Sequence, residues 1–174
     1  SAATVGNGAT RPGSPPRSNG SPGSRTAWCG STRTAARTAS PRWPAVLERH
    51  NELLAAAVAA NSGTVFGTEG DAVFAAFETA PRALAAAVAA QRALAAEPWD
   101  GGEPVRVRMG IHSGEGTVSG ETYVGIDVHR AARIANAGHG GQVLISAATR
   151  LLAQSSLGDG VTLRDLGEFR LKDL

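Results

Sequence analysis

Cysteine and long apolar runs are both scarce in this chain. Cys29 is the single cysteine among 174 residues, which excludes an internal disulfide framework and a zinc site built from several cysteines. No segment approaches the roughly 18 uninterrupted apolar residues that a membrane-spanning helix needs, since the alanine-rich run 83–96 contains Gln91 and Arg92. The first residues lack the basic-then-apolar pattern of a secretory signal. We therefore expect a cytoplasmic protein without a membrane span.

Acidic residues are missing from residues 1–44, which hold six arginines. The whole chain has 17 Lys and Arg against 15 Asp and Glu, so residues 45–174 keep 11 basic and 15 acidic side chains, a net charge of −4. The excess of basic over acidic residues in the chain thus lies in its N-terminal segment. This excess does not predict nucleic-acid binding by residues 45–174.

Large apolar residues are also missing from residues 1–44, where Val5 is the single Val, Ile, Leu, Met or Phe. A segment of Ser, Thr, Ala, Gly, Pro and Arg buries too little apolar surface to offset its ordering entropy. We predict disorder for this segment, at least to about residue 25. A shifted reading frame or a mis-set start would explain this composition. Residues 45–174 are predicted to form the folded domain.

Apolar periodicity begins near Ala45 and alternates with glycine-marked turns. The patterns predict these elements in chain order: a helix from Pro44 to about Gly63, strands at 64–66 and 72–77 joined as a hairpin, a helix from Thr79 to Glu97, a strand over 105–111, a helix over 126–137, a strand at 142–146, a short helix at 147–154 and an extended end. This order predicts an α+β or α/β sandwich with helices covering one sheet.

Two clusters could carry chemistry. Asp71 follows Gly70 at the predicted hairpin tip, where a carboxylate can bind a hard cation such as Mg²⁺, although a turn Asp more often bonds its own backbone. His129 and Arg133 are four residues apart and share one helix face, which suits a reacting phosphate. A solvated face, with Asp127 pairing an arginine, is the alternative.

Two further features favour structural roles. The segment 138–141 contains three glycines and could surround a phosphate, but no helix begins directly after it and a simple turn explains it better. His112 and His50 have no partner at metal-ligand spacing in the sequence. We therefore interpret both histidines as structural.

Taken together and in order, several stretches resemble the catalytic domain of the class III nucleotide cyclases, the adenylate/guanylate cyclase family. The matching segments are TVFGTEGDAVFAAF, VRVRMGIHSGE, YVGIDVHRAARIANA, GGQVLISAAT and LGEFRLKDL. The resemblance covers roughly residues 45–174. It implies a ferredoxin-like α/β sandwich that is active as a homodimer, or with a related cyclase chain. It also implies ATP as substrate, converted to cyclic AMP and pyrophosphate with two Mg²⁺ or Mn²⁺ ions.

The resemblance also assigns site residues. Asp71 matches one of the family's two metal-binding Asp residues, and Arg133 matches the Arg that stabilises the phosphate in the transition state. His129 stands where the family has the Asn that contacts the ribose. Gly67 and Thr122 occupy the two positions that select the purine; Thr122 is compatible with adenine, and Gly67 has no side chain to read it.

This sequence departs from the family in several places. The second metal-binding Asp belongs to a motif Phe-x-Asp-Ile-x-Gly-Ser-Thr, of which Gly30-Ser31-Thr32 remains. Ala27 stands at the Asp position and Arg25 at the Phe position. Lys172 is out of register with the family's phosphate-contacting Lys, and the sequence given stops before the family's closing strand.

Three interpretations follow. The leading one is an adenylate cyclase-type domain that is impaired as written. The second is a non-catalytic cyclase-like module that dimerises or senses nucleotide in a signalling protein, as Ala27, His129 and Gly67 suggest. The third, a ferredoxin-like interaction domain with no nucleotide role, is the least favoured because Asp71 and Arg133 are both present.

Overall fold

Alanine-rich segments form the two longest helices of this computed structural model, which describes residues 23–32, 41–99, 104–119, 122–124 and 126–171. Helix α1 spans Trp43–Ala60 and helix α2 spans Ala80–Ala96. Alanine has the highest helix propensity, and a proline in the first turn of each helix fits there because its missing N–H would have no partner. Both helices confirm the sequence prediction. Thr79 occupies the N-cap position of α2, but its side chain makes no capping hydrogen bond.

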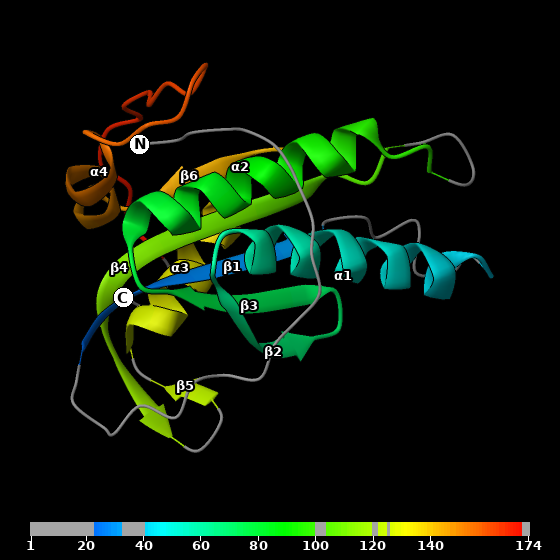
Figure 1. The fold of residues 1–174 in the computed structure, drawn as a ribbon, viewed down its shortest axis with the longest axis horizontal. Helices are drawn as coiled ribbons and strands as arrows, with labels where there is room; N and C mark the ends of the chain where they lie inside the picture. The colour runs from blue at the N-terminus through cyan, green and yellow to red at the C-terminus, as the bar shows by residue number, and fades with distance from the viewer. Residues whose placement is uncertain (1–22, 33–40, 100–103, 120–121, 125, 172–174) are drawn as a thin grey trace.

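Six strands form one sheet in the order β2-β3-β1-β4-β5, and β6 pairs with β4. The strands are β1 (Gly23–Thr32), β2 (Thr64–Glu69), β3 (Ala72–Phe77), β4 (Val107–Ser119), β5 (Thr122–Val124) and β6 (Val143–Ile145). The remaining helices are α3 (Ile126–Ala137) and α4 (Ala147–Ala153). All strand pairings are antiparallel except that of β4 with β6. The arrangement is α+β, as the sequence predicted (Figure 1).

Strand β1 corrects the interpretation of residues 1–44 as a disordered segment. Its ten residues lie between β3 and β4 and pair with both strands. The strand is held by backbone hydrogen bonds on both edges, which do not require apolar side chains. Apolar periodicity therefore could not reveal it. Residues 1–22 lie outside the described residues, so the predicted disorder of that part remains a prediction.

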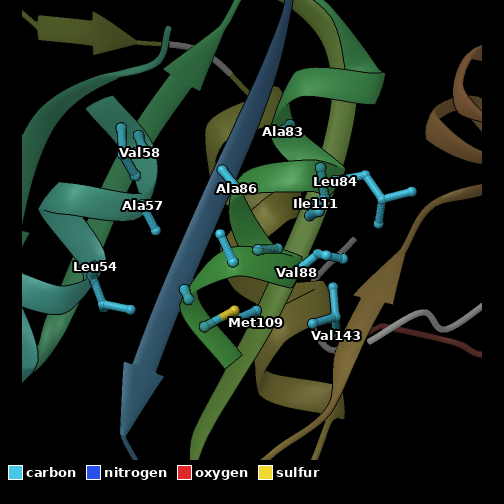
Figure 2. Close-up of a cluster of buried hydrophobic side chains, with 14 of the residues drawn as sticks. Leu54, Ala57, Val58, Ala83, Leu84, Ala86, Val88, Met109, Ile111 and Val143 are labelled. Carbon is cyan, nitrogen blue, oxygen red and sulfur yellow. The ribbon is translucent and has the colours of Figure 1, made fainter. Parts of the chain in front are cut away.

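The main core lies between one face of the sheet and helices α1 and α2. Val107, Met109 and Ile111 alternate along β4 and are completely buried, because successive side chains of a strand point to opposite faces. They pack with residues of both helices and of β6, as Figure 2 shows; the labelled side chains are Leu54, Ala57, Val58, Ala83, Leu84, Ala86, Val88, Met109, Ile111 and Val143.

Helix α3 covers the opposite face of the sheet. Gly110 points toward it, and a Cβ atom at this glycine would lie 2.3 Å from the carbonyl oxygen of Ala131 and from the nitrogen of Ala135. Ala131 and Ala135 are buried against the sheet, and Phe74 packs beside them. Small residues on both sides thus let α3 approach the sheet closely.

Two parts of the chain extend the sequence prediction. Strand β4 continues to Ser119 and forms a hairpin with β5, whereas the prediction ended that strand near Ile111. The strand and short helix predicted after Gly138 are confirmed as β6 and α4.

Among the described helices, none is long and apolar enough to cross a membrane.

Candidate functional site

Asp71 lies at the tip of the hairpin between β2 and β3. Gly70 precedes it with φ of 60°, a left-handed conformation that glycine adopts without strain. The Asp71 side chain is half-buried, and its charge acts on His50 of α1. Burial lowers the pKa of His50 below its ordinary value, while hydrogen bonding to Asn51 and the charge of Asp71 oppose this shift. His50 Nε2 is buried, and no described residue forms a hydrogen bond with it.

The described residues do not fit a two-metal site at this tip. Ala27 pairs with Ala76 across β1 and β3 and with His112 across β1 and β4. Ala76 is five residues beyond Asp71 along the chain, about 16 Å at the rise of a strand. Within the described ranges no group of three or more His, Cys, Asp and Glu residues could hold a metal ion. No Asp or Glu of β1 stands beside Asp71, which could contact one hard cation together with ligand oxygens.

The two predicted purine-contacting positions lie on strands that come close together. Gly67 follows a β-bulge in β2, where the register shifts between Val65 and Gly67. Thr122 begins β5 and pairs with Ser119 of β4. Strands β2 and β5 contact each other. The fold therefore brings both backbone segments to one region, and their roles remain predictions.

Helix α3 carries the other two predicted residues. His129 is exposed and Arg133 is half-buried. They are four residues apart, so they share a face that differs from the sheet-facing positions Ala131 and Ala135. The helix therefore presents an imidazole and a guanidinium together, as the spacing predicted.

A polar cluster under α3 contains a residue that sequence reasoning had set aside. His112 Nε2 lies 3.1 Å from Asp127 Oδ1, and Arg130 donates to the same oxygen at 2.9 Å. A Cβ atom at Gly114 would lie 2.2 Å from Asp127 Oδ2, so only glycine leaves room for this carboxylate. His112 thus has a partner, and Arg130 is the arginine that pairs with Asp127. The strand alternation gave a usable signal, because His112 shares the α3-facing side of β4 with Arg108 and Gly110.

Solved structures of nucleotide cyclases share this arrangement. The adenylate/guanylate cyclase/hydrolase from Silicibacter pomeroyi matches with a TM-score of 0.74 and 25% identity, over 87% of this chain and 90% of that one. The adenylyl cyclase CyaB from P. aeruginosa matches with a TM-score of 0.73 and 20% identity, over 87% and 88% of the two chains. The chain has the class III cyclase fold. The structural resemblance confirms the fold that the sequence motifs implied.

Further comparisons extend and limit this result. The guanylyl cyclase domain of the RhoGC fusion protein from Blastocladiella emersonii shares the cyclase fold with a TM-score of 0.71 and 22% identity, over 77% of this chain and 86% of that one. An uncharacterized protein of Mycobacterium tuberculosis and one of Mycobacterium bovis are each 42% identical over 106 residues, which is 61% of this chain. The chain spans about a third of the length of these curated relatives, since the match covers 35% of each. No family model matches the sequence.

Proposed function

We propose that this chain is an adenylate cyclase-type domain that forms cyclic AMP at or near background on its own. One observation carries the proposal: at the position of the family's second metal-binding Asp, β1 offers Ala27 rather than a carboxylate, and it pairs Ala27 with Ala76 rather than with the hairpin tip. Two-metal chemistry needs both carboxylates to hold its cations. Losing one should remove several kcal/mol of transition-state stabilisation, on the order of a thousandfold in rate.

In this proposal the remaining residues keep their roles toward nucleotide. Asp71 would contact a Mg²⁺ or Mn²⁺ ion that arrives with ATP, and Arg133 would contact the phosphates. His129 would lie near the ribose, and Thr122 and Gly67 near the purine. The partner would be a second copy or a related cyclase chain, in the cytoplasm. Binding of an ATP-type ligand is supported by one matching structure, the catalytic core of a rhodopsin-guanylyl cyclase with converted specificity in complex with ATPalphaS.

The same observation favours a second candidate, a non-catalytic cyclase-like module that dimerises or senses nucleotide. This candidate predicts nucleotide binding with no cyclisation at all. It differs from the leading proposal in one measurable respect, because an impaired enzyme retains a trace of activity that depends on its own site residues.

The test is a cyclic AMP assay of the full chain with ATP and Mn²⁺. Asp71→Ala and Arg133→Ala are compared with Arg164→Ala, an exposed arginine outside the candidate site, and ATP binding is measured on the same samples. Trace activity that the first two substitutions abolish supports the impaired enzyme. Binding without activity, weakened by Arg133→Ala, supports the module.

Other outcomes contradict the proposal. Robust cyclic AMP formation that both substitutions abolish would confirm the site and overturn the impairment. Activity that neither substitution changes would show that the site is wrong. A chain that neither binds nor cyclises ATP would leave the interaction-domain interpretation.

A further inference from the structure

Asp127 fills a space on β4 that the missing side chain of Gly114 leaves open. Asp127 is the second residue of α3, and its side chain is 15% exposed. A Cβ atom at Gly114 would overlap with the carboxyl group of Asp127 and would lie 3.0 Å from Asp127 Cβ. Any other residue at position 114 would therefore displace this carboxylate or push the start of α3 away from the strand.

Two donors hold the same carboxylate at its other oxygen. His112 Nε2 of β4 lies 3.1 Å from Asp127 Oδ1, and Arg130 donates to that oxygen at 2.9 Å from within α3. Because a carboxylate accepts, His112 is the donor in the first contact. We call Asp127, His112, Arg130 and Gly114 the Asp127 anchor. The anchor joins the first turn of α3 to the strand through a hydrogen bond, which depends on direction as well as distance.

Further along α3, the contacts with β4 involve small residues. Ala131 and Ala135 follow Asp127 at intervals of four residues, so these three positions form one row along the helix. Both alanines are buried against Gly110. Contacts of this kind are apolar and non-directional. They hold the helix against the sheet, but they do not fix its rotation about its own axis as the anchor does.

The candidate nucleotide-contacting residues of α3 depend on that rotation. His129 and Arg133 each lie two residues beyond a member of the row, Asp127 or Ala131. Two residues correspond to about 200° around a helix. At a side-chain radius of about 5 Å, a helix rotation of about 20° would move both side chains by roughly 2 Å. A displacement of this size is enough to misplace a group that must contact a ligand.

We propose that Asp127 is a positioning residue for nucleotide binding. Through His112 and the space at Gly114 it fixes the rotation of α3. At that rotation His129 and Arg133 face the nucleotide. The inference rests on the proposed function, because it requires that α3 contacts nucleotide, and it adds a residue that does not itself touch the ligand.

Simple electrostatics predicts the opposite sign for the loss of Asp127. Its carboxylate is negative, so removing it would by charge alone strengthen the attraction of the chain for a triphosphate. A positioning role predicts weaker binding instead. The direction of the change in affinity therefore separates the two effects.

The experiment measures the affinity of the full chain for a non-cyclisable ATP analogue with Mn²⁺ by isothermal titration calorimetry. Asp127→Ala should weaken the affinity about tenfold, because the released helix misplaces Arg133. Gly114→Ala changes no charge and should weaken it by a similar factor, because the added Cβ displaces the carboxylate. Asp127→Asn keeps an oxygen that accepts from His112 and should stay within about threefold of the unchanged chain.

Two controls separate position from stability. Val58→Ala removes buried apolar surface from the core on the opposite face of the sheet. It should destabilise the chain without changing the affinity, at a temperature where circular dichroism shows every variant folded. The double variant Asp127→Ala/Gly114→Ala should bind no more weakly than Asp127→Ala alone, because both substitutions act through one contact.

Three results would overturn the positioning role. The first is unchanged or tighter binding in Asp127→Ala, as expected if only the charge of Asp127 affects the ligand. The second is an equal loss of affinity in Val58→Ala, which would make stability the cause. The third is Asp127→Asn binding as weakly as Asp127→Ala. Each of these leaves the proposed function standing, whereas an unchanged chain that does not bind the analogue would overturn that function and the positioning role together.

Discussion

The two faces of the central sheet are built from opposite kinds of residue. Toward α1 and α2, strand β4 presents Val107, Met109 and Ile111, all fully buried in one apolar core. Toward α3, the same strand presents Gly110, His112 and Gly114. The face under α1 and α2 is stabilised by burial of large apolar side chains. The face under α3 has small or polar residues on β4, which leave room for the helix and its charged groups. The polar contacts of Asp127 with His112 and Arg130 therefore lie on the α3 face.

The largest expected effect is on the apolar face. Leu54 of α1 is fully buried in the core, so Leu54→Ala should lower the free energy of unfolding by about 3 kcal/mol through lost burial and the cavity left behind. Urea denaturation measures it. Leu151→Ala, at a position 69% exposed, is the control and should change little. Equal effects of the two substitutions would show that the face is not packed as described.

The next effect tests the α3 face by adding one methyl group. Gly110→Ala places a Cβ atom against the backbone of Ala131 and Ala135, which cannot rotate away, so α3 must shift at a cost of about 2 kcal/mol. Thermal unfolding would detect a fall of several degrees. Gly158→Ala has ordinary space around it and should be close to neutral. A neutral Gly110→Ala would contradict the close approach of α3.

A smaller and pH-dependent effect is expected from His50. Burial lowers its pKa in the folded state below the ordinary 6.5, so the unfolded state binds the proton first as pH falls. Stability contributed by neutral His50 is therefore present above pH 6.5 and is lost as the pH drops below it, by at most about 1.4 kcal/mol per pH unit. Urea denaturation between pH 7.5 and 5 measures the slope. His50→Leu should reduce it, whereas His139→Gln, at an exposed position, should not.

The smallest effect concerns β1. Ala27→Asp restores the carboxylate that the family has at this position. Residue 27 pairs with Ala76 of β3, however, and not with a residue of the hairpin tip. We expect cyclic AMP formation to rise little above that of the unchanged chain. A rise of a hundredfold or more that Asp71→Ala abolishes would show that the two carboxylates meet.

Local pattern was enough to predict part of this molecule. The alanine-rich helices, the β2–β3 hairpin and helix α3 each have their own apolar period, caps or breakers within a few residues. The motifs also led to the class III cyclase fold. Strand β1 was not predicted, because it is held by pairing with strands about 45 and 85 residues later in the chain rather than by its own apolar residues.

Only the parts of the candidate site that depend on local spacing were predicted from the sequence. Asp71 at the hairpin tip and the shared helical side of His129 and Arg133 follow from local spacing. The contact between His112 and Asp127 joins two elements that lie 15 residues apart, so no period of either element reveals it. The alternation of side chains along β4 limits which of them can face α3. Which of these side chains contact the helix depends on how α3 packs on the sheet.

The central claim is that β1 places no second metal-binding carboxylate beside Asp71 at the β2–β3 hairpin tip, and a count of bound Mn²⁺ tests it most directly. Electron paramagnetic resonance can measure free and bound Mn²⁺ in the full chain with a saturating ATP analogue that cannot cyclise. We predict at most one Mn²⁺ per chain beside the nucleotide, with weaker binding after Asp71→Asn. Two Mn²⁺ ions of similar affinity per chain would contradict the account.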